Sequence, residues 1–192
     1  MNSVLLWQRI DTVGVEYAEL EWDPLRIQGE VVLVEDGAPF AVSYRLECDQ
    51  AGLTARAHVQ VKRSGARNEL TLTRGRAGDW NANGCLVPAL HGIADVDLSI
   101  TPSTNTPPIR RLGLRVGQAA AVTAAWVRLP SLDVAPLRQV YRRMEANVYE
   151  YEAPDLSFRA TLEVNDEGVV RKYGDLWRLV SGERRDPSAT NA

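Results

Sequence analysis

Two carboxylates open the stretch of residues 95–114, DVDLSITPSTNTPPIRRLGL, which gathers the side chains best able to do chemistry. Polar and apolar residues alternate strictly over residues 95–100, and this predicts a strand with one face in an apolar layer. Asp95 and Asp97 then share a face and, at a rise of about 3.3 Å per residue, stand roughly 6.6 Å apart. Two carboxylates so close cannot both ionise in a dry site unless donors or a cation neutralise them. The face must therefore be wet or meet a binding partner.

Four hydroxyl and amide side chains follow at residues 103–106, and such groups can donate and accept hydrogen bonds at once. Pro102, Pro107 and Pro108 fix the backbone around them and predict a stiff turn. Groups of this kind suit the hydroxyls of a sugar, so Asn105 is a candidate ligand-binding residue. In the alternative interpretation, Asn105 and its neighbours only close an Asx-type turn on their own backbone.

Arg110 is the next candidate, because residues 109–116 are expected to form a strand in which it shares a face with Leu112 and Leu114. A guanidinium buried on an apolar face costs several kcal/mol unless it is paired, and a carboxylate in bidentate geometry is the obvious partner. A salt bridge to Asp95 or Asp97 and a ligand-binding role are both open.

Asp79 and Trp80 lie in a glycine-rich connection, residues 75–84, where an aromatic ring beside a carboxylate could hold a sugar. Tyr149 offers a further ring face. The alternative for Trp80 is that it closes one end of the core. A metal site drawn from His91, Cys85, Asp95 and Asp97 matches no established ligand spacing, so no metal and no cofactor is expected.

The composition and charge of the chain argue against several classes of function. The net charge of -3 and the absence of a basic field with interleaved aromatics argue against nucleic-acid binding. No run approaches the roughly 18 apolar residues of a membrane helix, and the first residues lack a basic signal-peptide region. A cytoplasmic protein without an integral membrane segment is expected, with Cys48 and Cys85 reduced.

The predicted elements are mostly strands separated by turn signals, and one helix is expected over residues 134–146, where Leu137, Val140, Tyr141 and Met144 recur at helical spacing. Such a pattern excludes alternating βαβ units and predicts a mainly β fold, a large antiparallel sheet curled as a β-roll around the helix. Residues 1–180 are expected to form this single domain, and residues 181–192 a disordered tail. Strands are expected over residues 5–10, 13–22, 25–34, 40–48, 53–63, 69–73, 95–100, 109–116, 119–127, 148–152, 156–164 and 169–180.

The sequence resembles a bacterial family described as putative glycolipid-binding, formerly a domain of unknown function. The resemblance implies a β-roll around one helix, a remote likeness to periplasmic lipoprotein carriers, a tendency to dimerise and an acidic pocket. Onto the matching strings it carries Asp79, Asp95, Asp97, Asn105 and Arg110. It runs from Trp7 to about Trp177, is loose over the first 70 residues, and rests on Asp95–Leu98, Thr101–Pro102, Thr104–Leu112, Gly78–Trp80, Pro130–Leu132, Gln139–Tyr141, Tyr149–Tyr151 and Gly168–Tyr173.

The function expected from these residues is binding of an amphipathic, sugar-headed lipid in a non-catalytic way, with a place in glycolipid metabolism. The head would meet Asp95, Asp97 and Asn105, and the tail would lie inside the roll. A glycoside hydrolase using two carboxylates is the enzymatic alternative, although neighbours on one strand face cannot easily flank a bond from opposite sides. The third interpretation is a structural or interaction protein. A homodimer is expected in any case, because residues 119–127 are apolar on both strand faces.

Overall fold

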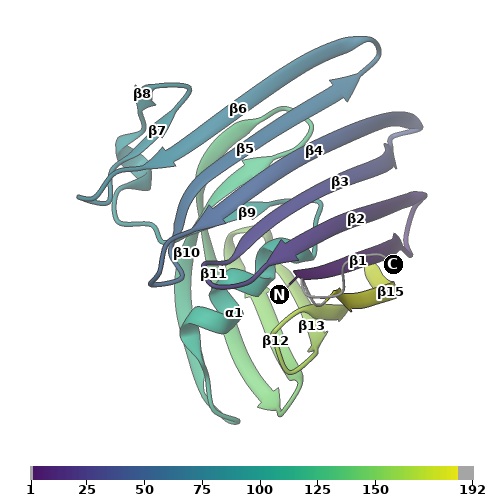
Figure 1. Ribbon diagram of the computed structural model, residues 1–192, viewed down its shortest axis with the longest axis vertical. Helices are drawn as coiled ribbons and strands as arrows, with labels where there is room; N and C mark the ends of the chain where they lie inside the picture. Colours follow the sequence, from purple (N-terminus) through teal and green to yellow (C-terminus); the bar gives the residue numbers. More distant parts are fainter. Residues whose placement is uncertain (1, 186–192) are drawn as a thin grey trace, which may run out of the picture.

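A single 15-stranded sheet, strongly curled, makes up most of the computed structural model, which describes residues 2–185 (Figure 1). The strands follow the order β8-β7-β6-β5-β4-β3-β2-β1-β15-β14-β13-β12-β11-β10-β9. Neighbouring strands are antiparallel except β9 and β10, which run parallel. The mainly β fold with a curled sheet and a single α-helix is therefore confirmed, and the sheet is mixed rather than wholly antiparallel.

Alternation of apolar and polar residues accounts for most of these strands; in β3, for example, buried and exposed positions alternate from Arg26 to Leu33. Three 3-10 helices, η1 (Pro88–Leu90), η2 (Ser103–Asn105) and η3 (Pro154–Leu156), and helix α1 (Thr106–Leu112) complete the described chain. The strands are β1 (Asn2–Arg9), β2 (Gly14–Glu21), β3 (Arg26–Glu35), β4 (Ala38–Cys48), β5 (Thr54–Arg63), β6 (Ala66–Arg74), β7 (Trp80–Ala82), β8 (Cys85–Leu86), β9 (Asp95–Leu98), β10 (Ala119–Arg128), β11 (Asp133–Glu145), β12 (Val148–Ala153), β13 (Phe158–Val164), β14 (Val170–Tyr173) and β15 (Trp177–Arg185).

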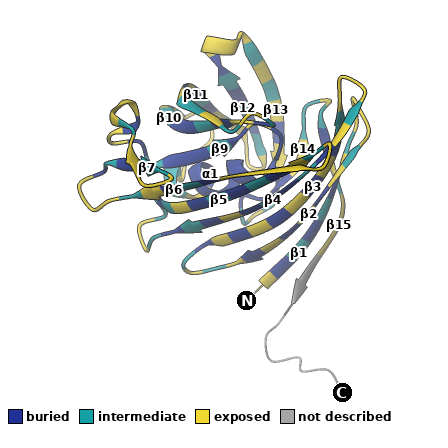
Figure 2. Ribbon diagram, turned by 90° about the horizontal axis from the view of Figure 1, so that it is seen from above, coloured by how far each residue is buried: buried dark blue, intermediate teal, exposed yellow. Residues whose placement is uncertain are grey.

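Strands β9 and β10 have both faces covered. Val96 and Val127 belong to a large apolar core that they share with strands β1 to β7. Asp97 and Trp126 are register partners, so their side chains share the opposite face, and Trp126 packs against a second core on β11 to β14. Figure 2 shows buried positions alternating with exposed ones along the strands of the curled sheet. The apolar character of residues 119–127 on both faces is thus explained within one chain and does not itself require a dimer.

The helix expected over residues 134–146 is wrong, because this segment is strand β11. Leu137, Gln139 and Tyr141 alternate toward the interior, and a spacing of four residues between Leu137 and Tyr141 fits both a strand and a helix. Pro136 is accommodated because β11 is paired only with β10 at this point, and pairing with β12 begins at Val140. A proline lacks the N–H that a second neighbour would need.

The strand expected over residues 109–116 is also wrong, since helix α1 occupies Thr106–Leu112. Pro107 and Pro108 lie in its first turn, where their missing N–H groups leave no hydrogen bond unmade. Gly113 ends the helix in the left-handed conformation, with φ of 53°. The proline pair followed by a glycine is therefore a helix signal here.

Strand β15 continues to Arg185 and so extends past the domain boundary expected at residue 180. The rest of the expected tail, residues 186–192, lies outside the described residues. In the part of the chain that is described, no helix has the length and apolar character needed to cross a membrane.

Candidate functional site

A cavity of about 160 Å³ opens between strand β9 and the inner faces of β10 to β14. A volume this small suits one ring-sized group, because whole drug-sized ligands occupy pockets of roughly 300–1,000 Å³. Its lining joins a carboxylate, an amide and several aromatic rings to an apolar margin. The lining residues are Arg9, Asp97, Leu98, Ser99, Thr101, Asn105, Trp126, Leu137, Tyr151, Ala153, Leu156, Phe158, Tyr173, Leu176 and Trp177.

Asp97 is the carboxylate of this cavity. The Gln139 side chain donates a hydrogen bond to it from Nε2 at 2.5 Å, and the Tyr151 hydroxyl also hydrogen bonds to it. Burial raises the pKa of Asp97 from 3.8 to about 6, against the lowering effect of these two hydrogen bonds. Asp97 forms no ion pair with any described lysine or arginine, so its charge at neutral pH is balanced only by neutral donors.

A chain of buried side chains holds Asp97 in place. The Tyr141 hydroxyl donates to Oδ1 of Asn105 at 2.9 Å and lies 3.5 Å from Oε1 of Gln139. The Asn105 amide group in turn donates to the carbonyl of Pro102 at 3.2 Å. These contacts orient the side-chain amides of Asn105 and Gln139. The oriented Gln139 amide in turn holds the Asp97 carboxylate in one position.

Aromatic side chains form the walls. Tyr151 makes edge-to-face contacts with Phe158 and Tyr173, with ring centroids 6.1 and 5.9 Å apart. The Arg9 guanidinium lies 5.2 Å from the centroid of Trp177. Leu156, which is 47 % exposed, marks the margin of the cavity.

Asp95 shares a strand face with Asp97, as predicted, but has a different partner. It is 2 % exposed and forms a salt bridge with Arg111 of helix α1. Burial raises the pKa of Asp95, while the hydrogen bond and charge of Arg111 lower it. The expected crowding of two carboxylates is therefore resolved by separate environments, one with a cation and one with neutral donors.

Arg110 is exposed and does not pair with either aspartate, so the salt bridge considered for it belongs to Arg111 instead. It lies 4.7 Å from the ring of Trp22 and donates to the carbonyl of Glu167 at 3.1 Å. Successive side chains of a helix point in directions about 100° apart. Because residues 109–112 are helical and not a strand as expected, Arg111 and not Arg110 faces Asp95. Tyr149 is buried beside Arg143, and with Arg110 it lines a separate surface hollow of about 410 Å³.

Asp79 and Trp80 are not brought to the Asp97 cavity. Trp80 is fully buried in the first core, where its Nε1 donates to the carbonyl of Ile93 at 3.0 Å, so it has the core position considered as the alternative. The Asp79 side chain is half exposed, and Oδ1 lies 2.9 Å from Nδ1 of His91. Among the described residues, no three His, Cys, Asp or Glu side chains gather in a way that could hold a metal ion.

The interior of the roll is filled by residues 101–109, all of them buried. Within it, Tyr44 and Thr101 each donate to Oε1 of Glu16 at 2.5 Å, and Ser103 contacts both hydroxyls. Oε2 of Glu16 is buried without a hydrogen-bond partner. Gly29 makes room for this cluster, because a Cβ there would lie 2.4 Å from the Tyr44 ring. The interior that was expected to take a lipid tail is thus occupied by the chain itself.

Of the candidate residues named from the sequence, Asp97 and Asn105 line this cavity. Gln139, which donates to Asp97, was not among those candidates, and neither were the lining residues Trp126, Tyr151, Phe158, Tyr173 and Trp177. The available signal was strand alternation: Tyr151 lies two residues from Tyr149, and Gln139 lies between Leu137 and Tyr141 on the inner face of β11. Assigning β11 as a helix hid Gln139 among supposed polar-face residues.

Fold and site together define a curled, single-sheet β-roll whose interior carries a small aromatic cavity around one carboxylate. The chain belongs to the family described as "Putative glycolipid-binding", whose family model matches residues 4–179.

The chain is similar to a DUF1089 family protein from Pseudomonas aeruginosa of known crystal structure, with 32% sequence identity over 86% of this chain and 91% of that one, and a TM-score of 0.80. It shares its fold with a β-barrel-like DUF1849 protein from Brucella abortus, at 10% identity over 96% and 97% of the two chains and a TM-score of 0.56. No match was found among curated proteins.

Proposed function

We propose that this protein binds an amphipathic lipid with a sugar head and that the head enters the Asp97 cavity. The observation that carries the proposal is the combination of a fixed, unpaired carboxylate with ring faces in one small cavity. Carboxylate oxygens accept hydrogen bonds from neighbouring sugar hydroxyls, and aromatic rings stack on the apolar face of a sugar. The family description points to the same ligand class.

The lipid tail is proposed to leave the cavity over its apolar margin. Leu156 and Leu176 lie there together with Phe158, and Leu156 is exposed. This path replaces the interior of the roll, which the buried residues 101–109 occupy.

Binding without catalysis agrees better with this cavity than glycoside hydrolysis does. Hydrolases of the two-carboxylate type place one carboxyl group on each side of the scissile bond. Asp97 is the sole acidic residue among those that line the described cavity, and Asp95 is held by Arg111.

Asp97→Asn is expected to weaken binding of octyl β-glucoside about tenfold, because a charged acceptor becomes a neutral one, a difference of roughly 1.4 kcal/mol. Stability at pH 7.5 should stay unchanged or rise. The folded-state pKa of about 6 lies above the ordinary 3.8, so the folded protein binds more protons and loses stability as pH rises from about 4 to 6. The Asp97→Asn variant has no carboxyl group to ionise at this position, so it does not lose this stability as the pH rises.

Tryptophan fluorescence titration and thermal shift, with the detergent below its micelle concentration, measure both effects. Asp79→Asn, a half-exposed acidic position away from the cavity, is the control and should bind as wild type does. Unchanged affinity in Asp97→Asn would remove the cavity from the proposal.

We also propose a homodimer. Exposed apolar side chains gather on the outer face of β2 and β3, where Val15 and Val32 are register partners and Val13 is 73 % exposed. An apolar group of this kind on an outer sheet face favours self-association. Sedimentation at micromolar concentration should give twice the chain mass of 21.2 kDa, and Val15→Lys should reduce it to the monomer mass. A monomer for the unmodified protein would overturn this proposal.

A cytoplasmic location is proposed as well. Cys85 is an exposed free cysteine, and exposed thiols persist in reducing compartments.

A further inference from the structure

The charge balance of the Asp97 cavity identifies what kind of head group it suits. Asp97 accepts hydrogen bonds from Gln139 and Tyr151, and both donors are neutral. Burial raises the pKa of the neighbouring hydroxyls of Tyr141, Tyr151 and Tyr173, so none of them ionises near neutral pH. Asp97 therefore carries the cavity's one negative charge at neutral pH and above, and it forms no ion pair with a described lysine or arginine.

The one cation that lines the cavity, Arg9, is already engaged. Its guanidinium forms a two-pronged salt bridge with Asp11 and lies over the Trp177 ring. Asp95, on the same strand face, is neutralised by Arg111. The carboxylates of Asp11 and Asp95 are thus each paired with an arginine. Asp97 is partly accessible from the cavity and has no arginine or lysine partner among the described residues.

Ring faces around an uncompensated carboxylate favour a cation. Trp126, Tyr151, Phe158, Tyr173 and Trp177 all line the cavity. Arg128 and Arg9 already lie over the rings of Trp126 and Trp177, so Tyr151, Phe158 and Tyr173 are the rings left for a ligand cation. Aromatic faces attract a cation through the ring quadrupole, and hydrogen bonds to charged groups are stronger than those between neutral groups. A neutral sugar would use the rings and the oxygen atoms but would leave the negative charge unbalanced.

We infer that the head group bound by this protein carries a cationic nitrogen, protonated or quaternary, which pairs with Asp97 inside the aromatic cavity. The inference rests on the proposed function, because it assumes that a lipid head enters this cavity. An amino sugar satisfies both requirements. A choline-type head supplies the cation without the sugar.

The test compares four probes at pH 7.5 by fluorescence titration: choline, and octyl glucosaminide, its N-acetylated form and octyl β-glucoside, the three glycosides below their micelle concentrations. The amine should bind at least about tenfold more tightly than the two neutral glycosides. In Asp97→Asn the affinity for the amine should fall about a hundredfold, so that the preference disappears, while the neutral glycosides lose about tenfold.

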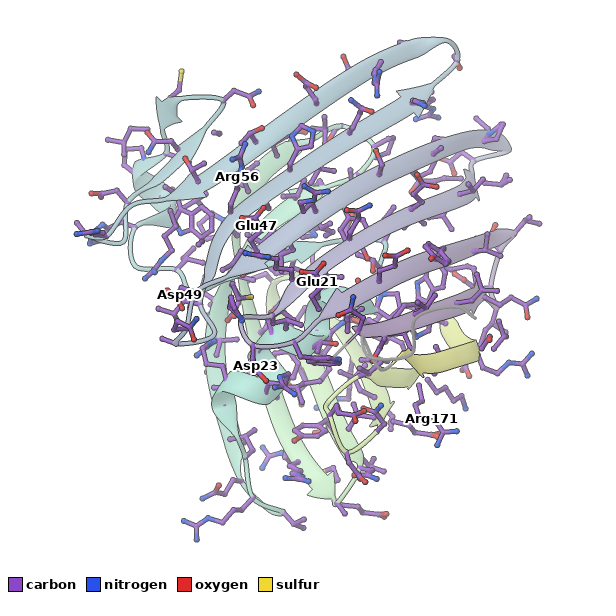
Figure 3. The ribbon with its side chains drawn as sticks, viewed as in Figure 1. Glu21, Asp23, Glu47, Asp49, Arg56 and Arg171 are labelled. Atoms are coloured by element: carbon purple, nitrogen blue, oxygen red, sulfur yellow. The ribbon has the colours of Figure 1, made fainter. Side chains whose placement is uncertain are left out.

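The control must separate this cavity from the negative charge on the outside. In the view of Figure 3, the labelled Glu21, Asp23, Glu47 and Asp49 lie toward the same end of the N-terminal strands, where Arg26 pairs with Glu21. Glu21→Gln removes one of these exterior charges, and it should leave the preference for the amine intact. Loss of the preference in Glu21→Gln would instead assign it to the exterior charge and overturn the inference.

The outcomes separate the two proposals. Equal or tighter binding of the neutral glycosides overturns the cationic head and leaves glycolipid binding standing. Choline bound as tightly as octyl glucosaminide, and lost in Asp97→Asn, supports the cation and overturns the sugar. Failure of every probe to bind wild type overturns both.

Discussion

Arg111→Ala is expected to lower the free energy of unfolding by about 3–5 kcal/mol at pH 8, the range for breaking a buried ion pair by removing one partner. Arg111 is the only salt-bridge partner of the 2 % exposed Asp95 carboxylate among the described residues. Oδ1 of Asp95 has no hydrogen-bond partner even in the intact protein. Without the guanidinium the carboxylate must stay charged in an apolar place or take up a proton.

The measurement is chemical denaturation of Arg111→Ala beside wild type at pH 8 and pH 5. Burial already raises the pKa of Asp95, so the loss should shrink at the lower pH, where the carboxyl group can become neutral. Arg110→Ala is the matched control. Its exposed side chain stacks on Trp22, a contact worth about 0.5–1 kcal/mol at exposed sites. Equal losses in the two variants would contradict the assignment of the structural pair to Arg111.

Glu16→Gln is expected to raise the free energy of unfolding at pH 8 by up to about 3 kcal/mol, the free energy that corresponds to the raised pKa of Glu16. Burial raises the pKa of Glu16 from 4.5 to about 7, against hydrogen bonds from Thr101, Tyr44 and Ser103 that lower it. The folded state therefore binds more protons than the unfolded state, and stability falls as pH rises from about 4.5 to 7. Glutamine keeps the acceptor for Tyr44 and Thr101 and carries no charge.

The gain should vanish at pH 4.5 and below, where the wild-type carboxyl group is neutral as well. Urea denaturation across pH 4 to 8 measures the difference at each pH. Glu19→Gln, on the exposed side of the same strand, is the control and should show no such pH-dependent gain. A Glu16→Gln variant less stable than wild type at pH 8 would mean that the buried carboxylate is stabilised by a partner other than these hydroxyls.

The strands could be predicted from sequence because a two-residue alternation is a local property, and β3 shows it from Arg26 to Leu33. The position of the helix could not be predicted from the sequence. Leu137 and Tyr141 satisfy both periods, and only the pairing of β11 with β10 decides between them. The parallel pairing of β9 is likewise a long-range property, since its partner lies beyond helix α1.

The candidate site was predictable in part for the same reason. Asp97 stands out because its strand alternates so regularly, and Asn105 because prolines surround it. Gln139 lies 42 residues beyond its partner Asp97, and Tyr141 lies 36 residues beyond its partner Asn105, so these contacts form only when the sheet curls. That Asp95 and Asp97 have opposite electrostatic surroundings also depends on which residue of α1 faces β9.

The seam between β1 and β15 has a consequence for how the chain folds. Residues 2 and 185 are register partners there, and the seam joins the half of the sheet built from β2 to β8 to the half built from β9 to β14. Contacts so distant in sequence give a high contact order, which places folding in the millisecond-to-second range rather than in microseconds. During synthesis β1 emerges long before β15 and keeps an open hydrogen-bonding edge until β15 is available to pair with it. The nascent protein is therefore most exposed to strand-edge aggregation while the second half of the roll is still being made.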